Sequence, residues 1–285
     1  MPQTRPDPIV SCAWLAERLD APDLRPVDAT WFMPSDPRDA KALFAERRIP
    51  GAVFFDIDEI ADTGSPLPHM LPSPEKFASR MRRLGVGDGA QVVVYDSQGL
   101  FSAARVWWTF RAMGHEDVVV LDGGLPEWER GGFPIENGPP QKRMERHFTA
   151  RLRSDLVRDL GDMRRITEHK TSPVLDARPG DRFRGEAPEP RPGLRSGHMP
   201  NSISVPSGSL VGADGKLKSH EELQQVFDVA GVDTRQQAVC SCGSGVTASI
   251  IALALARLGR WDAAVYDGSW AEWGAQQDTP VLTSA

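Results

Sequence analysis

The sequence predicts an α/β protein made of two copies of one domain, each a mainly parallel sheet flanked by helices. Two observations carry this prediction: the chain resembles itself at a spacing of about 146 residues, and short apolar runs alternate with helical segments in both halves. Strand–helix alternation of this kind is typical of a parallel sheet covered by helices. A chain of 285 residues has room for two such domains.

Five pairs of segments align in the same order in the two halves. Residues 73–86 and 219–232 both begin with Ser, have Glu two residues later, repeat apolar side chains at an interval of four and end in Gly-Val, which predicts one amphipathic helix per copy. The other pairs are 27–30 with 175–178, 49–56 with 199–206, 91–96 with 237–242 and 122–128 with 267–273. Offsets that drift between 145 and 150 residues indicate two domain copies with loops of different length.

The elements of the second copy can be assigned in order along the chain. Residues 221–231 and 246–259 are predicted helices, the second ended by Gly259. The predicted strands are 174–177, 202–205, 238–241 and 263–266.

The boundary between the copies lies where apolar residues become scarce. The segment around 135–160 has turn residues and then charges, which is typical of a linker. We therefore predict domains at 1–138 and 161–285, joined by 139–160.

Composition excludes several classes of protein. Lys and Arg number 33 and Asp and Glu 39, so the net charge is −6, a poor basis for nucleic-acid binding. No apolar run approaches the ~18 residues of a membrane span, and the first ten residues lack the apolar core of a signal peptide. Three cysteines are too few for a disulfide framework. We expect a cytoplasmic protein with no membrane or nucleic-acid partner.

The strongest local signal is the loop CGSGVT, residues 242–247. An apolar strand ends at Cys242, and an apolar helix begins directly after the loop. A loop that leads into a helix N-terminus directs several N–H groups and the positive end of the helix dipole to one point, where they stabilise a thiolate. Gly243 and Gly245 allow close backbone approach there. The alternative is a small buried cysteine at a tight turn.

The repeat supplies an internal comparison for this loop. Asp96 takes the place of Cys242 in the first copy, while Gly99 still matches Gly245. A carboxylate cannot act as a sulfur nucleophile, so we predict one catalytic domain and one supporting domain.

Besides the loop at 242–247, the segments 49–58, 65–72, 182–193, 197–200 and 266–273 carry a family resemblance. On these residues the chain resembles the tandem-rhodanese sulfurtransferases over nearly its whole length. Within that family it is most similar to the enzymes that use 3-mercaptopyruvate. Thiosulfate-using members typically have Cys-Arg-Lys-Gly-Val-Thr in the loop, where this sequence has Gly243 and Ser244. Thiosulfate is a small dianion favoured by positive charge beside the sulfur, whereas mercaptopyruvate has its carboxylate several bonds from the thiol.

The resemblance implies a two-step covalent reaction. Cys242 would take the sulfur of 3-mercaptopyruvate as a persulfide, release pyruvate, and pass the sulfur to a thiol, such as thioredoxin or a small thiol, or to cyanide. No metal and no organic cofactor are expected. The loop residues Gly243, Gly245, Val246 and Thr247 would bind the reacting sulfur.

The resemblance also assigns residues outside the loop. Arg182 and Arg191 would bind the substrate carboxylate with bidentate hydrogen bonds. Asp58, His69 and Ser244 would form a relay that moves a proton as pyruvate leaves. Without the resemblance, the arginines would simply pair with nearby glutamates, and His69 would be a hydrogen-bonding loop residue.

Three other functions stay open at this point. The first is a thiosulfate:cyanide sulfurtransferase, and the second is a non-catalytic sulfur carrier or regulatory module. The third is a cysteine phosphatase, which would need an arginine near the end of its loop; residues 243–249 contain none.

Overall fold

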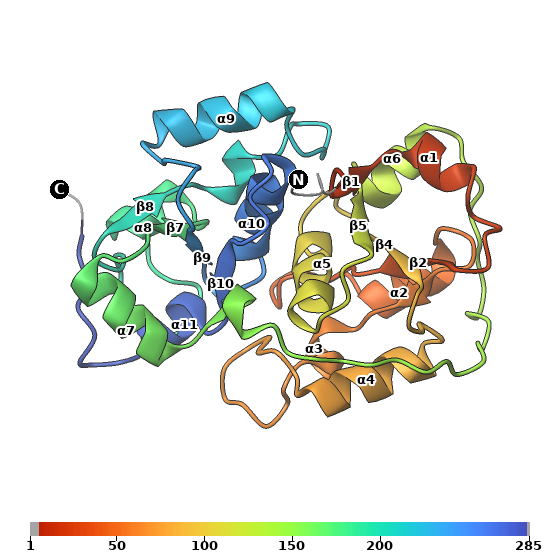
Figure 1. The fold of residues 1–285 in the computed structure, drawn as a ribbon, viewed down its shortest axis with the longest axis horizontal. Helices are drawn as coiled ribbons and strands as arrows, with labels where there is room; N and C mark the ends of the chain where they lie inside the picture. The colour runs from red at the N-terminus through yellow and green to blue at the C-terminus, as the bar shows by residue number, and fades with distance from the viewer. Residues whose placement is uncertain (1–5, 284–285) are drawn as a thin grey trace, which may run out of the picture.

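The computed structural model describes residues 6–283 and contains two α/β domains side by side (Figure 1). Each has a five-stranded sheet in which all neighbouring strands are parallel. The first sheet has the order β1-β5-β4-β2-β3, built from β1 (Ile9–Val10), β2 (Leu24–Asp28), β3 (Val53–Phe54), β4 (Gln91–Tyr95) and β5 (Val118–Leu121). The second has the order β6-β10-β9-β7-β8, built from β6 (Val157–Arg158), β7 (Val174–Asp176), β8 (Ser202–Ser204), β9 (Val239–Ser241) and β10 (Ala264–Tyr266).

The two sheets have the same topology strand for strand, so the predicted fold class is confirmed. The helices of the first domain are α1 (Cys12–Ala16), α2 (Ala40–Glu46), α3 (Ile57–Ile60), α4 (Pro74–Arg83), α5 (Ala103–Ala112) and α6 (Gly124–Arg130). Those of the second are α7 (Leu160–His169), α8 (Gly180–Arg184), α9 (His220–Val229), α10 (Ala248–Arg257) and α11 (Ser269–Trp273), with short 3-10 helices η1 (Ser154–Leu156) and η2 (Ser207–Ser209).

The paired helices α4 and α9 begin as the sequence predicts. The hydroxyls of Ser73 and Ser219 accept backbone N–H groups of the first turn, which are otherwise unbonded at a helix start. The apolar side chains at the predicted interval of four are all buried against the sheets: Phe77, Met81, Leu223 and Phe227.

The other predicted elements of the second domain are found with shorter bounds. Each predicted four-residue strand has three residues in the sheet. The helix predicted at 246–259 begins at Ala248, because Val246 and Thr247 belong to the turn before it. Gly259 follows its end with φ +84°, a conformation that favours glycine.

The connection between the domains runs along the first domain. Residues 139–153 form no helix or strand and bond to the first domain at several points; for example, the N–H of Arg151 donates to the carbonyl of Met113 at 2.9 Å. The last part of the predicted linker 139–160 contains β6, which pairs with β10 of the second sheet.

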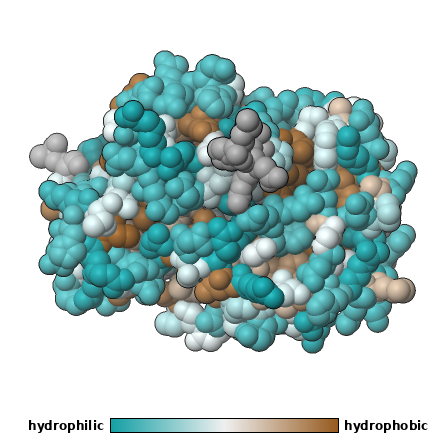
Figure 2. Space-filling model, in the orientation of Figure 1, coloured by the Kyte–Doolittle hydropathy of each residue, from teal (hydrophilic) through white to brown (hydrophobic). Residues whose placement is uncertain are grey.

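The domains meet through α5 and α10, which lie side by side in the centre of Figure 1. All ten residues of α5 are buried, and so are the first nine of α10. Figure 2 shows hydrophilic residues over most of the viewed face, with small scattered hydrophobic areas. Within residues 6–283, no helix is long and apolar enough to cross a membrane.

Candidate active site

Cys242 lies at the carboxyl end of β9, directly before the turn into α10. Ligand sites in parallel α/β sheets lie at this end of the strands. Cys242 is only 2% exposed, and its Sγ accepts the backbone N–H of Gly245 at 3.1 Å. The backbone N–H of Cys242 donates to the hydroxyl of Ser269 at 3.2 Å. The Cys242 loop, residues 242–247, is therefore held from within and from α11.

Gly245 is required by the shape of this loop. Its φ is +79°, and a Cβ there would lie 2.8 Å from Nη1 of Arg105 and 3.0 Å from the carbonyl oxygen of Asp267. A side chain at this position would collide with both neighbours, so the close approach of the loop depends on glycine.

The equivalent loop of the first domain binds an anion of its own. Both oxygens of the buried Asp96 carboxylate accept backbone N–H groups, from Gln98 and Phe101 at 2.8 Å and from Ser102 and Ala103 at 2.9 Å. This turn into a helix is therefore an anion-binding cradle. In the first domain Asp96 fills it.

In the second domain, Cys242 takes the place of Asp96 in the equivalent turn. At the repeat offset of 146 residues, the donors to Asp96 correspond to Ser244, Thr247, Ala248 and Ser249. Here the N–H of Gly245 donates to Sγ of Cys242 at 3.1 Å, whereas the N–H of Ser249 donates to the carbonyl of Val246 at 3.3 Å. The turn leads directly into the N-terminus of α10, the positive end of the helix dipole. The loop can therefore stabilise negative charge on Cys242 or on a sulfur attached to it.

The other two cysteines lie outside this environment. Both are buried and free. Burial raises the pKa of Cys12 to about 11 and raises that of Cys240 further. Neither lines the cavity beside Cys242.

That cavity, of about 260 Å³, is lined by residues of both domains. The first domain contributes the apolar side chains of Trp31, Met33 and Phe101. The predicted site residues that line it are Cys242, Gly243, Ser244, Val246, Thr247, Arg182 and Arg191. Three predicted site residues, Gly245, Asp58 and His69, are not part of the cavity wall.

The two predicted arginines lie over the residue that follows Cys242. A Cβ on Gly243 would be 3.3 Å from Nη2 of Arg182 and 3.9 Å from Nη1 of Arg191. Arg182 donates to Glu189, which also binds Arg178 at 2.7 Å. The alternative of pairing with a nearby glutamate therefore describes part of the surroundings of Arg182.

Arg191 is different, because it forms no ion pair or hydrogen bond within residues 6–283. Burial lowers the pKa of Arg191, while the nearby Cys242, Glu189 and Asp58 favour its charged form. A half-buried guanidinium without a carboxylate partner is suited to bind an anionic ligand.

Asp58 and His69 form a pair, as the resemblance implies. Oδ1 of Asp58 lies 2.9 Å from Nδ1 of His69, and its Oδ2 accepts the indole N–H of Trp31 at 2.9 Å. These contacts, His69 first, hold the pKa of Asp58 below its ordinary value, and Arg191 adds to this. No hydrogen bond joins His69 to Ser244 within residues 6–283, so the three-residue relay stays a prediction.

Sequence reasoning missed two neighbours of the site. Trp31 packs edge-on against His69, with ring centroids 4.8 Å apart, and nothing in its local sequence marks it. For Ser269 the repeat offered a signal, because this serine aligns with Gly124 of the first copy. In the structure both residues have positive φ, +50° and +54°. A serine in a glycine conformation indicates that its hydroxyl is needed there.

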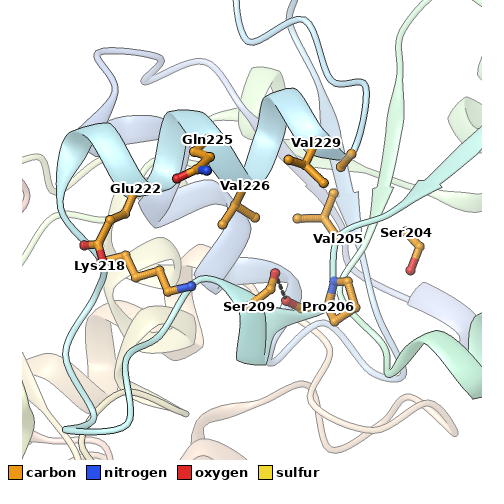
Figure 3. Close-up of a pocket in the computed structure, with 10 residues that line it drawn as sticks. Ser204, Val205, Pro206, Ser209, Lys218, Glu222, Gln225, Val226 and Val229 are labelled. Carbon is orange, nitrogen blue, oxygen red and sulfur yellow. Dashed lines mark hydrogen bonds between the residues drawn. The ribbon is translucent and has the colours of Figure 1, made fainter.

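A larger cavity lies elsewhere on the second domain (Figure 3). It has a volume of about 470 Å³ and lies between α9 and the segment from Ser204 to Ser209, where Val226 and Val229 face Val205. No residue of the Cys242 loop lines it, so we do not assign it to the reaction.

Comparison with known proteins identifies the class. The rhodanese-like domain family matches twice, over residues 11–130 and 159–276, and the chain belongs to this family. Among its relatives, the human 3-mercaptopyruvate sulfurtransferase is 44% identical over 93% of this chain and 91% of its own. Thiosulfate/3-mercaptopyruvate sulfurtransferase 1 of Arabidopsis thaliana is 41% identical over 96% and 78%. The crystal structure of SseA from Escherichia coli, described as a 3-mercaptopyruvate sulfotransferase, superposes with a TM-score of 0.85 at 41% identity, covering 93% of this chain and 99% of that one.

Proposed function

We propose that this protein is a 3-mercaptopyruvate sulfurtransferase that carries sulfur as a persulfide on Cys242. One observation supports it above the others: Cys242, held in an anion-binding loop, shares a cavity with an unpaired arginine, Arg191. A substrate with a sulfur at one end and a carboxylate at the other fits this arrangement. The names of the relatives point to the same substrate.

In the first step, the thiolate of Cys242 attacks the thiol sulfur of 3-mercaptopyruvate. A sulfur–sulfur bond forms, the carbon–sulfur bond breaks, and its electron pair leaves with the carbon as the enolate of pyruvate. The thiol proton stays on the outer sulfur of the new persulfide. Arg191 and Arg182 hold the carboxylate during this step.

The enolate must then gain a proton to become pyruvate. Ser244 lines the cavity beside Cys242. His69, paired with Asp58, would supply this proton through the hydroxyl of Ser244.

In the second step, an acceptor takes the outer sulfur and Cys242 leaves as a thiolate. A thiol such as thioredoxin or a small thiol would become a persulfide, and cyanide would become thiocyanate. The three free cysteines fit a reducing compartment, so we place this reaction in the cytoplasm.

A thiosulfate sulfurtransferase is the second candidate, because one relative is named for both substrates. Gly243 and Ser244 put no positive charge in the loop beside the sulfur. Arg182 and Arg191 reach over that loop from outside it. We therefore expect thiosulfate to be the poorer substrate.

The test compares the two donors with cyanide as the common acceptor. Pyruvate formation from 3-mercaptopyruvate should have a kcat/KM at least roughly tenfold above sulfite formation from thiosulfate, the ratio produced by about 1.4 kcal/mol of differential binding. A preference for thiosulfate would refute the proposed substrate. No turnover of either donor would favour a non-catalytic carrier.

A further inference from the structure

We propose that the buried ion pair Arg105–Asp267 holds the His69 loop, residues 69–71, against the Cys242 loop. It joins the two domains, and neither partner lines the catalytic cavity. Both are therefore positioning residues. The inference rests on the proposed function, in which these two loops act on one substrate.

Arg105 contacts both loops with one guanidinium. It lies on α5 and is 2% exposed. Its Nη2 binds Oδ1 of Asp267 at 2.6 Å and also donates to the carbonyl of His69, while Nη1 donates to the carbonyl of Gly245 at 3.4 Å. The guanidinium packs over the ring of Trp108, 4.6 Å from its centroid. The planar, multidentate shape of arginine allows all these contacts at once.

Asp267 completes the arrangement from the second domain. Its Oδ2 accepts the backbone N–H of Leu71 at 2.7 Å, so the ion pair holds the His69 loop at both ends. Two residues further on, the hydroxyl of Ser269 accepts the backbone N–H of Cys242. The segment that begins at Asp267 thus bonds to both loops.

The backbone of His69 needs such support. Its φ is +62°, a left-handed conformation that is unfavourable for a residue with a Cβ. Its carbonyl is bonded to Arg105, and the N–H two residues later is bonded to Asp267. Because this turn sets where the imidazole lies beside Asp58, the ion pair controls the position of the proton-transfer group.

The internal repeat shows that the hydrogen bond from the Leu71 N–H to Asp267 has an equivalent on the other side of the domain interface. Leu217 is the counterpart of Leu71, and Asp122 is the counterpart of Asp267. The N–H of Leu217 donates to Asp122 at 3.1 Å. The bond from aspartate to a loop of the other domain therefore occurs on both sides of the interface.

Among the described residues, the ion pair with the aspartate occurs on one side of the interface. The counterpart of Arg105 at the offset of 146 residues is Ile251, which is buried in α10. On the Asp122 side, Arg257 of α10 donates to the carbonyls of Leu217 and Lys218 at 3.1 and 3.0 Å, but the described residues show no ion pair between it and Asp122. On the side that contains Cys242, the arginine instead comes from another turn of the helix, pairs directly with the aspartate and also contacts the Cys242 loop. This difference points to a role for Arg105 at the site in addition to domain assembly.

Arg105→Gln should lower kcat for pyruvate release about 10- to 100-fold, the effect of a displacement of about 1 Å in a catalytic group. KM for 3-mercaptopyruvate should stay nearly unchanged, because Arg182 and Arg191 are untouched. Arg105→Lys keeps the charge beside Asp267 but cannot reach all the carbonyls, so it should recover part of the lost kcat.

Arg111→Gln is the matched control. Arg111 is equally buried on the same helix and donates across the same interface, to the carbonyl of Trp261 at 2.9 Å, away from both loops. Arg111→Gln should lower the unfolding temperature but leave kcat for pyruvate release nearly unchanged. In a His69→Gln background, Arg105→Gln should have little further effect on kcat, because both substitutions impair the same function, proton transfer by His69.

Hydrogen exchange of the Leu71 amide gives a readout that does not need activity. It should speed up in Arg105→Gln and in Asp267→Asn, and not in Arg111→Gln. Equal kcat and equal exchange in Arg105→Gln and Arg111→Gln would overturn the inference. A wild-type protein that releases no pyruvate would instead refute the proposed function, and the exchange measurement would still decide whether the ion pair holds the loop.

Discussion

Arg182 and Arg191 occupy the same cavity wall but are held differently. Arg182 is fixed by Glu189, whose other partner, Arg178, is itself bonded to Asp176. Arg191 has no such support within the described chain. Such a charge beside the cavity is what the proposed carboxylate-binding role requires.

Removal of Arg191 should therefore weaken substrate use without weakening the fold. Loss of a charge-assisted hydrogen bond costs about 1.5–3 kcal/mol, so Arg191→Ala and Arg182→Ala should each lower kcat/KM for 3-mercaptopyruvate roughly 10- to 150-fold. Arg182→Ala should also lower the unfolding temperature, because it leaves Glu189 with one partner. Arg184→Ala, an exposed arginine paired with Glu186, is the control. Normal kcat/KM in both cavity variants would place the carboxylate anchor elsewhere.

Ser269 allows a test of backbone strain at the site. Its hydroxyl accepts the N–H of Cys242, and its φ of +50° is costly for any residue with a Cβ. Ser269→Ala loses the bond and keeps the strain, so its free energy of unfolding should fall by about 1–3 kcal/mol. Ser269→Gly should lose less, because glycine adopts this conformation freely. Urea unfolding measures both, and a glycine variant less stable than the alanine variant would contradict this explanation.

At the scale of elements, the turn after β4 and the turn after β9 are equivalent in the two domains but hold different side chains, Asp96 and Cys242. The Asp96 side chain fills the turn of the first domain with its own carboxylate, and Cys242 occupies the same place in the second domain. Sequence alignment of the two copies predicted this difference. The four N–H bonds to Asp96 could not be read from the sequence, because they depend on how the turn folds.

Asp96→Ala should destabilise the first domain and leave the chemistry to Cys242. Four backbone N–H groups would lose their acceptor, which predicts a loss of about 2–4 kcal/mol of unfolding free energy. Pyruvate release per folded molecule should remain, as measured below the unfolding transition. Complete loss of activity in a folded variant would show that the first domain takes part in sulfur transfer directly.

The charge of the Cys242 loop should control the choice of donor. Replacing Gly243 by Arg and Ser244 by Lys places two charges beside the sulfur and should shift the kcat/KM ratio toward thiosulfate. The φ of Gly243 is not positive, so the backbone accepts arginine; the nearby Nη2 of Arg182 must move aside. A folded variant with an unchanged donor ratio would show that charge in the loop does not set specificity.

At the scale of the whole molecule, local patterns predicted the domains and distant contacts completed the site. The helices at Ser73 and Ser219 were predictable because their caps and apolar faces are encoded within a few residues. The two-residue strand β6 was missed because it has no periodicity and belongs to the sheet only through β10.

The same reason limits what the sequence says about the site. The predicted nucleophile, Cys242, and its loop form one continuous motif. Arg105 and Asp267 lie 162 residues apart in the chain, and only the packing of the two domains brings them together. A pair at that separation leaves no local pattern, so structure was needed to find it.

Mass spectrometry of the protein after treatment with 3-mercaptopyruvate tests the central claim most directly. Without an acceptor, we expect one added sulfur, about 32 Da, on Cys242, and its removal by cyanide. Cys240 lies two residues away, so fragmentation must separate the two sites, or a Cys240→Ser variant must be used. Cys242→Ser should keep its fold and gain no sulfur. Pyruvate release with the sulfur on Cys240 or Cys12, or with no sulfur on the protein, would contradict the account.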